Sequence, residues 1–276
     1  MSRARSFLKE FTPPIVLHAI RRMQSTNLHF EGNYESWEKA SANCSGYNAE
    51  NILPKVLDAT LKVKRGKAAF ERDSVLFDEI EYDWPVISGL MWVAARNHGK
   101  LNVLDFGGAL GSSYFQSRKF LEDLPEVRWN VVEQLHYVQA GQENIQDDCL
   151  RFYPTIDACL AENNPCVALL SSVLEYLSDP VLILNKIFDA GVDVLIINRT
   201  LFSLNGLERI VIQNVSSEIF DASIPCRMLS EELIVNICKR NNMNLMASFP
   251  SIGGKTQNYQ YRGLMFIRSS YEMPAM

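Results

Sequence analysis

The stretch "NVLDFGGALGSSYFQSRKFLEDL", residues 102–124, places three glycines between an apolar run and a segment with helical spacing. Asp105 ends the apolar run, and the glycines of the following turn are Gly107, Gly108 and Gly111. Glycine lets a ligand approach the main chain closely, and a helix start offers unpaired N–H groups to polar ligands. The stretch predicts a strand, a loop and a helix that hold a nucleotide-like ligand. An ordinary tight turn that uses glycine only for packing would show the same pattern.

Apolar runs rich in Val, Ile and Leu alternate with amphipathic segments from Leu101 onward. The predicted strands are "LNVLDFG" (101–107), "RWNVVEQ" (128–134), "CVALLSSVLEY" (166–176) and "VDVLIINRTL" (192–201), and the predicted helices are 113–123, 135–147, 156–163 and 179–190. Strands that are covered by helices on both faces lose their polar alternation, as these have. The pattern predicts an α/β fold with a parallel, doubly wound sheet.

The end of the chain has a different pattern. A helix capped by Ser230 is predicted over "SEELIVNICKRNNM" (230–243). The turn-rich segment "GGKTQN" (253–258) then joins two strand-like runs, "NLMASFPSI" (244–252) and "YRGLMFIRS" (261–269). With no helix between them, these runs predict an antiparallel pair that closes the sheet.

Residues 1–100 are predicted to be mostly helical, with helices over 51–66 and 84–99. We expect two domains: an N-terminal helical cap that covers the substrate in residues 1–100, and a ligand-binding domain in residues 101–276. Trp37 and Tyr47 lie in a segment rich in Tyr, Trp, Asn and Ser, which suits sugar hydroxyls and sugar faces. The same residues also suit a polar loop around buried aromatic anchors.

Composition excludes several classes of protein. The 276 residues are 47% hydrophobic and 21% charged, which is typical of a globular protein with one large core. A net charge of −5 argues against a nucleic-acid partner. The six cysteines and four histidines show no metal-ligand spacing, and no run is long enough to span a bilayer. We therefore expect a cytoplasmic protein without a metal site.

Three polar residues strengthen the ligand-binding interpretation. Glu133 follows the second strand, where a carboxylate can accept both hydroxyl protons of a ribose. The strand predicted at 166–176 ends in "SSVLEY", which places Ser171 and Ser172 at the carboxyl edge of the sheet, where ligands of open α/β sheets bind. A phosphate-binding loop is excluded because the "GGKT" segment has Phe249 where that motif needs its first glycine. Dehydrogenase fingerprints are also absent, and S-adenosylmethionine is the cofactor that fits best.

The segment "VLDFGGALG" (103–111) resembles the first motif, D-x-G-x-G-x-G, of class I S-adenosylmethionine-dependent methyltransferases, with Ala109 at the middle glycine. "SSVLEYL" (171–177) resembles the fourth-strand segment of their small-molecule enzymes, with Tyr176 in place of the common histidine. The resemblance implies a Rossmann-like, mostly parallel seven-stranded sheet that ends in a hairpin. The resemblance and the residue pattern agree that Asp105, Gly107, Gly108 and Gly111 cradle the methionine and ribose parts of the cofactor. Glu133 is expected to hold the ribose hydroxyls, and Ser171 and Ser172 are further cofactor-binding candidates at the sheet edge.

Five segments together resemble a narrower bacterial group of methyltransferases, encoded among polysaccharide-assembly genes; these segments are "YESWEKASANCSGYN", "RDSVLFDEIEYDWP", "LDFGGALGSSYFQSRKFL", "WNVVEQ" and "SSVLEYL". The match covers most of the chain from about residue 30. It implies methyl transfer to a small-molecule or glycan acceptor, with a hydroxyl as the expected nucleophile.

Methyl transfer from a sulfonium is an in-line displacement that needs alignment and, for a hydroxyl acceptor, a base. The candidate catalytic residues after the strands are Glu175, Tyr176, His136 and Arg199. Glu175 or His136 suits a base near neutral pH better than tyrosine, whose ordinary pKa is about 10. Each candidate also has a structural interpretation, as a solvent-facing, rim or ion-paired residue. Phe152 is interpreted as a core residue rather than an adenine contact.

Two alternative functions stay open at this point. A non-catalytic S-adenosylmethionine-binding or regulatory module would explain Ala109 and the missing histidine, and a nucleotide-sugar oxidoreductase would bind NAD. The first 22 residues carry five basic residues, several apolar residues and a single acidic residue, Glu10. Such a segment can lie in an anionic membrane interface, whereas Pro13 and Pro14 favour short helices that dock onto their own domain.

Overall fold

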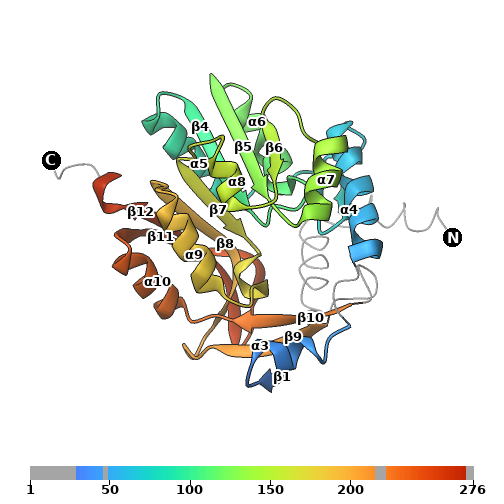
Figure 1. Ribbon diagram of the computed structural model, residues 1–276, viewed down its shortest axis with the longest axis vertical. Coiled ribbons are helices and arrows are strands. Elements are labelled where there is room, and N and C mark those ends of the chain that lie inside the picture. The colour runs from blue at the N-terminus through green and yellow to red at the C-terminus, as the bar shows by residue number, and fades with distance from the viewer. Residues whose placement is uncertain (1–28, 46–48, 215–221, 272–276) are drawn as a thin grey trace, which may run out of the picture.

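A central seven-stranded sheet dominates the computed structural model, which describes residues 29–45, 49–214 and 222–271. Its strands are β4 (Lys100–Phe106), β5 (Glu126–Val132), β6 (Leu150–Tyr153), β7 (Val167–Ser171), β8 (Val194–Ser203), β11 (Met243–Lys255) and β12 (Tyr259–Arg268). They lie in the order β11-β12-β8-β7-β4-β5-β6 (Figure 1). β12 pairs antiparallel with β8 and with β11, whereas the other pairs are parallel. The predicted mostly parallel sheet and its closing hairpin are confirmed.

Helices cover both faces of this sheet. One face carries α4 (Ala49–Lys64), α5 (Trp84–Arg96), α6 (Ser112–Leu121) and α7 (Leu135–Asn144), and the other carries α8 (Ile156–Leu160), α9 (Pro180–Asp189) and α10 (Glu231–Arg240). Strand β8 shows how the sheet serves both layers: Ile196 belongs to the first core cluster, and Leu195 and Ile197 belong to the second. Because both faces are buried, the strands have no polar alternation, which is the pattern that predicted a doubly wound fold.

Side-chain caps start several of the helices. Ser230 begins α10, and its hydroxyl accepts a hydrogen bond from the Leu233 N–H at 3.3 Å. Asp179 caps α9 in the same way and is followed by Pro180, whose ring fixes the backbone of the first helical position. These caps satisfy main-chain donors that lack a partner within the helix, and they confirm the predicted start of the last helix.

Two smaller sheets lie outside the predicted pattern. β1 (His29–Tyr34), β9 (Arg209–Asn214) and β10 (Ser223–Met228) form an antiparallel sheet in the order β1-β9-β10, flanked by α3 (Trp37–Ser41). β2 (Phe70–Arg72) and β3 (Val75–Phe77) form a hairpin. Short 3₁₀ helices η1 (Leu174–Tyr176) and η2 (Ser269–Tyr271) follow β7 and β12. The three-stranded sheet packs against η1, so it lies close to the carboxyl ends of the central strands.

The helical cap expected in residues 1–100 is not confirmed. Helix α5 buries Leu90 and Val93 in the core of the central sheet, so it belongs to the doubly wound layers rather than to a separate cover. Strand β1 pairs with β9, nearly two hundred residues later in the chain. The basic segment at residues 1–22 and Tyr47 lie outside the described residues. Over the described ranges, no helix combines the length and apolar character needed to cross a bilayer.

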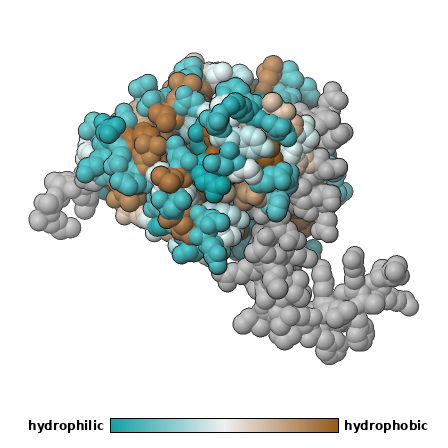
Figure 2. All heavy atoms as spheres, turned by 90° about the horizontal axis from the view of Figure 1, so that it is seen from below, coloured by the Kyte–Doolittle hydropathy of each residue, from teal (hydrophilic) through white to brown (hydrophobic). Residues whose placement is uncertain are grey.

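The surface is mixed in polarity. Figure 2 shows separate hydrophobic patches among hydrophilic atoms on the face seen from below in Figure 1. The large apolar side chains that are most exposed include Trp84 on α5, Leu135 on α7 and Leu207 before β9. They come from different elements, and scattered exposed apolar residues are normal for a folded protein.

Gly141 of α7 tests the packing of that helix against the sheet. A Cβ at this position would lie 2.7 Å from ring carbons of Phe152, which is a core residue, as predicted, with 2% of its surface exposed. Overpacking of this kind costs about 1–3 kcal/mol, more than the gain of up to about 1 kcal/mol from the higher helix propensity of alanine. Gly141→Ala should therefore lower the free energy of unfolding in urea.

The matched control is Gln139→Ala on the exposed side of the same helix. It adds no atoms to the core and should change the free energy of unfolding by less than about 0.5 kcal/mol. Equal stability of Gly141→Ala and Gln139→Ala would contradict the described contact between α7 and β6.

Candidate functional site

The candidate site lies where the direction of the chain reverses across the sheet. From β4 the chain proceeds outward through β5 and β6, and it then returns to β7 and β8 on the other side of β4. Ligands of open α/β sheets bind at the carboxyl ends of the strands at such a point. The loops after β4 and β7 touch there, because a Cβ on Gly107 would lie 2.4 Å from Val173 Cγ2.

The loop after β4 needs glycine for two physical reasons. Gly107 and Gly111 have φ values of 73° and 91°, which side chains other than glycine rarely adopt. A Cβ on Gly108 would lie 2.4 Å from Asp105 Oδ2, so the loop closes directly over that carboxylate. Helix α6 begins at Gly111 without a side-chain cap, which leaves the N–H groups of its first turn for other acceptors.

Asp105 lies beneath this loop with 1% of its surface exposed. Its Oδ2 accepts a hydrogen bond from Trp129 Nε1 at 2.8 Å, and its buried Oδ1 has no hydrogen-bond partner within residues 29–45, 49–214 and 222–271. Burial raises the pKa of Asp105 to about 7; the Trp129 hydrogen bond opposes this rise, and the charge of Glu133 adds to it. Asp105 therefore supports the loop from below and presents one oxygen that still lacks a donor.

Glu133 connects the end of β5 to the glycine loop. Its Oε2 accepts a hydrogen bond from the Gln134 N–H at 2.5 Å, and its carboxylate also accepts one from the Ala109 N–H. Burial raises the pKa of Glu133, and these two hydrogen bonds oppose the rise. The structure thus brings Glu133 and the loop together, as the sequence predicts.

Ser171 and Ser172 lie at the carboxyl end of β7, also as predicted. The Ser171 hydroxyl accepts a hydrogen bond from Asn198 Nδ2 at 3.2 Å. Ser172 has a φ of 55°, and its hydroxyl donates to Glu175 Oε1 at 3.5 Å. The two serines therefore connect the end of β7 to β8 and to the 3₁₀ helix η1.

Glu175 is fully buried, with 0% of its surface exposed. Burial raises its pKa to about 8, and the hydrogen bond from its own main chain, the charge of Arg199 and the Ser172 hydroxyl oppose the rise. Its Oε2 has no hydrogen-bond partner among the residues that the structure describes. The adjacent Tyr176 donates its hydroxyl proton to Gln213 Oε1 of β9 at 2.9 Å. The three-stranded sheet thus holds η1 in place.

Arg199 reaches the same region from an irregular part of β8. The register between β8 and β12 shifts at this point, and Arg199 has a φ of 49°. The Arg199 N–H donates to Ser251 Oγ at 3.1 Å, and its Nη2 forms an ion pair with Asp73 Oδ2 at 3.3 Å. Irregularities of this kind re-aim a side chain and are frequent beside active sites.

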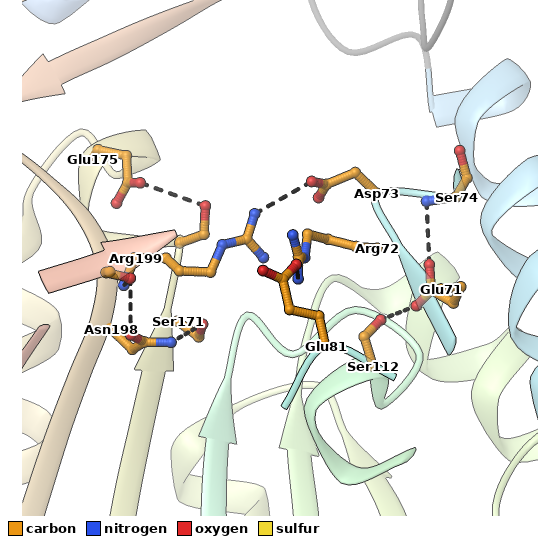
Figure 3. A network of polar contacts seen from close by, with 12 residues as sticks. Glu71, Arg72, Asp73, Ser74, Glu81, Ser112, Ser171, Glu175, Asn198 and Arg199 are labelled. Carbon is orange, nitrogen blue, oxygen red and sulfur yellow. Dashed lines mark hydrogen bonds and ion pairs between the residues drawn. The ribbon is translucent and has the colours of Figure 1, made fainter. Parts of the chain in front are cut away.

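The hairpin β2–β3 is the part of the site that the sequence analysis missed. Glu71 accepts hydrogen bonds from the Ser112 hydroxyl and, at 3.2 Å, from the Ser74 N–H, whereas Asp73 pairs with Arg199. Figure 3 shows the hairpin reaching from the start of α6 to β8 across the carboxyl ends of the strands. The signal in the sequence is the polar turn of "FERDSVLF" (70–77) between two short apolar runs.

Two other predicted residues have their described ring contacts with residues outside this cluster. His136 is the second residue of α7, which follows β5, and its ring lies 4.9 Å from that of Tyr137. Trp37 begins α3 beside the three-stranded sheet, with the Arg227 guanidinium 5.6 Å from its ring. The catalytic candidates that the structure brings together are Glu175, Tyr176 and Arg199.

Backbone strain is concentrated around the site. Of the seven described non-glycine residues with positive φ, five belong to the loops and strand ends described above: Asp73, Ser74, Ala109, Ser172 and Arg199. Such conformations persist only where the surrounding structure enforces them, and they cluster at active sites and ligand clamps. Asp73 and Ser74 form the two-residue turn of the β2–β3 hairpin, for which positive φ is ordinary, so Ala109, Ser172 and Arg199 are the residues whose backbone conformation supports the assignment of the site.

No protein-family profile and no curated protein sequence matches the chain. Among solved structures, the chain is similar to a Burkholderia thailandensis 1,6-didemethyltoxoflavin N1-methyltransferase with bound S-adenosylhomocysteine, at 12% identity over 88% of this chain and 96% of that one (TM-score 0.43). It is also similar to a Synechocystis magnesium protoporphyrin IX methyltransferase, at 15% identity over 78% of this chain and 99% of that one (TM-score 0.47). A third, LepI in complex with S-adenosylmethionine, is 14% identical over 80% and 65% (TM-score 0.43). The residues of the site, rather than these similarities, are the basis for the function proposed below.

Asp105 and Glu175 should make the stability of the fold depend on pH. Burial raises their pKa values to about 7 and about 8, whereas carboxyl groups of an unfolded chain ionise near pH ~4. Between these limits the folded state binds more protons than the unfolded state. The free energy of unfolding should therefore fall as the pH rises, by about 1.4 kcal/mol per pH unit for each group protonated only in the folded state.

Glu175→Gln should remove the contribution of Glu175 and reduce this slope between pH 5 and pH 8. Urea denaturation at half-unit steps of pH measures the slope for both proteins. Glu143→Gln, which replaces an exposed carboxylate on α7, is the control and should retain the slope of the natural chain. An identical slope in Glu175→Gln and the natural chain would show that Glu175 does not titrate as its burial requires.

Proposed function

We propose that this chain binds S-adenosylmethionine at the carboxyl ends of β4 and β5 and transfers its methyl group to a small-molecule or glycan acceptor. The observation that carries the proposal is the meeting of Glu133, the glycine loop and the uncapped start of α6 at the point where the sheet reverses direction. A carboxylate beside a glycine loop and free main-chain donors suits the ribose and the polar end of such a cofactor.

The residues present fit this cofactor in their chemistry. Glu133 would accept hydrogen bonds from the ribose hydroxyls, and the first turn of α6 would donate to the carboxylate of the methionine part. Asp105 Oδ1, which is buried and has no partner among the described residues, would accept a further donor. When bound, S-adenosylmethionine supplies an electrophilic methyl group, so the chain's own residues have to orient the acceptor and take its proton.

Glu175 is the residue that we assign to the proton. An acceptor hydroxyl loses its proton as the methyl group is transferred, and Oε2 of Glu175 has no hydrogen-bond partner in the described part of the chain. A pKa of about 8 makes this carboxyl group a stronger base, once ionised, than an ordinary glutamate. O-methylation of a glycan in surface polysaccharide assembly is the specific form of the reaction that the sequence resemblance supports.

A second candidate function is a module that binds S-adenosylmethionine without turnover. The complete burial of Glu175 favours it, because a base has to meet the acceptor proton within hydrogen-bond reach. The two functions share the cofactor site and differ only in whether methyl groups are transferred.

Isothermal titration with S-adenosylmethionine and S-adenosylhomocysteine tests the cofactor site. Both ligands should bind the natural chain, and Glu133→Gln should weaken binding about 10- to 100-fold because a hydrogen bond to a charged group contributes about 1.5–3 kcal/mol. Glu143→Gln on the exposed surface of α7 is the control and should retain full affinity. Absence of binding by the natural chain would overturn the proposal.

Transfer of a labelled methyl group to fractions of a small-molecule and glycan extract tests the catalytic assignment. Glu175→Gln should lower the rate about 10²- to 10⁴-fold, the usual contribution of a general base, with unchanged affinity for S-adenosylhomocysteine. The rate of the natural chain should rise with pH and level off above about pH 8. Cofactor binding without a labelled product in any fraction would favour the non-catalytic module instead.

A further inference from the structure

Two arginines face each other on the acceptor side of the site. Arg72 lies at the end of β2 and Arg199 on β8, and Figure 3 shows their guanidinium groups turned toward one another at the centre of the polar network. Their side chains are 15% and 23% exposed, so both cations are largely removed from water. The pKa of Arg72 is lowered from the ordinary value of arginine. Burial is the largest cause, and the positive charge of Arg199 is the second.

Each arginine has a carboxylate partner that is far more exposed than itself. Arg72 pairs with Glu81 at 3.1 Å and Arg199 with Asp73 at 3.3 Å, and the two carboxylate side chains are 56% and 62% exposed. Ion pairs with partners this exposed contribute little, because water solvates the free carboxylate well. An arginine can form two parallel hydrogen bonds with a carboxylate or phosphate, so a better-placed anion can replace such a partner.

Main-chain and side-chain contacts fix the position of Arg199. Its N–H donates to Ser251 Oγ, which donates in turn to Asn198 Oδ1 at 3.1 Å. Asn198 also donates to Asp83 Oδ2 at 2.8 Å. Asp73, in contrast, lies in the two-residue turn of the β2–β3 hairpin, where it and Ser74 both have positive φ. The main chain of the arginine is therefore held in place, whereas the aspartate is carried on an exposed turn.

We propose that the methyl acceptor carries a carboxylate or phosphate group that binds between Arg72 and Arg199, and that the Asp73 carboxylate holds this place until the acceptor displaces it. The inference deepens the proposed function and rests on it, since it names the chemical class of the acceptor. An anion at this point offsets the repulsion between two cations that the fold holds close together. It also places the acceptor beside Glu175, since the positive charge of Arg199 acts to lower the pKa of that carboxyl group.

The two halves of the Asp73–Arg199 pair should have opposite effects on anion binding. The test titrates inorganic phosphate and acetate, separately, into the full chain saturated with S-adenosylhomocysteine, with affinity measured by NMR line shifts or calorimetry. Asp73→Asn removes the internal competitor and should tighten anion binding about two- to fivefold. Arg199→Gln should weaken it at least tenfold, and Arg199→Lys should retain part of the phosphate binding because a point charge remains.

Glu126→Gln is the matched control, because Glu126 also forms an ion pair with an exposed side chain, Lys100, at the amino ends of β5 and β4, on the opposite edge of the sheet from the two arginines. It should leave anion affinity unchanged. Retained affinity for S-adenosylhomocysteine shows that each variant is folded. Anion binding that is unchanged or weaker in Asp73→Asn would overturn the inference, because a purely structural ion pair predicts that result.

A second arm separates the acceptor from the cofactor as the source of the anion. The same titration is repeated with the chain saturated with 5′-methylthioadenosine, which lacks the amino-acid carboxylate. Binding of phosphate in both arms supports the acceptor site, whereas binding only beside 5′-methylthioadenosine would assign the arginines to the cofactor and overturn the inference. Failure of S-adenosylhomocysteine to bind would overturn the proposed function itself, and the anion titration of the ligand-free chain would still decide whether the arginine pair binds anions.

Discussion

The hydrogen bond from Trp129 to Asp105 ties together the two strands on which the site is built. The indole is completely buried, and its N–H meets the carboxylate at the end of the neighbouring strand. Because Asp105 lies directly under Gly108, this contact fixes the height at which the chain turns after β4. Glu133 follows four residues after Trp129 and meets the other side of the same loop. One polar contact in the core thus sets the positions of the loop and of the acid that faces it.

Burial of its carboxyl groups makes this arrangement unfavourable in free energy, and the same unfavourable burial can favour ligand binding. A carboxyl group in an apolar core resists ionisation unless donors surround it, and both Asp105 and Glu175 retain an oxygen without a partner in the part of the chain that the structure describes. These two groups lie on either side of the junction between β4 and β7. A ligand that donates hydrogen bonds at this junction satisfies atoms that the fold leaves unsatisfied, so binding and stability are coupled at the same residues.

The sequence predicts those parts of the molecule in which local pattern and tertiary structure agree. The run around Ile196 is apolar throughout because helices cover both of its faces, and Ser230 begins a helix because its hydroxyl satisfies a main-chain donor. Parallel strands also bring their carboxyl ends to one edge of the sheet, so the sequence alone predicts that Glu133 and Ser171 lie near the glycine loop.

The missed parts depend on pairings between distant residues. Strands β2 and β3 have three residues each, too few to show a period, and Asp73 meets Arg199 across 126 positions of sequence. Strand β1 finds its partner β9 only in the folded chain, which is why residues 1–100 resembled a helical unit. A register shift beside Arg199 has no local signature either, because it arises from how β12 fits against β8.

The hairpin joins the two halves of the site through consecutive residues. Glu71 is 2% exposed and holds the first residue of α6, on the side where the cofactor is proposed to bind. Arg72 and Asp73 face Arg199, on the side of the acceptor. Since neighbouring residues of a strand point to opposite faces, Glu71 and Arg72 reach the two halves of the site from one short strand, β2. The proposed cofactor side and the proposed acceptor side therefore share one support, and their relative position depends on the contacts of this hairpin with Ser112 and Arg199.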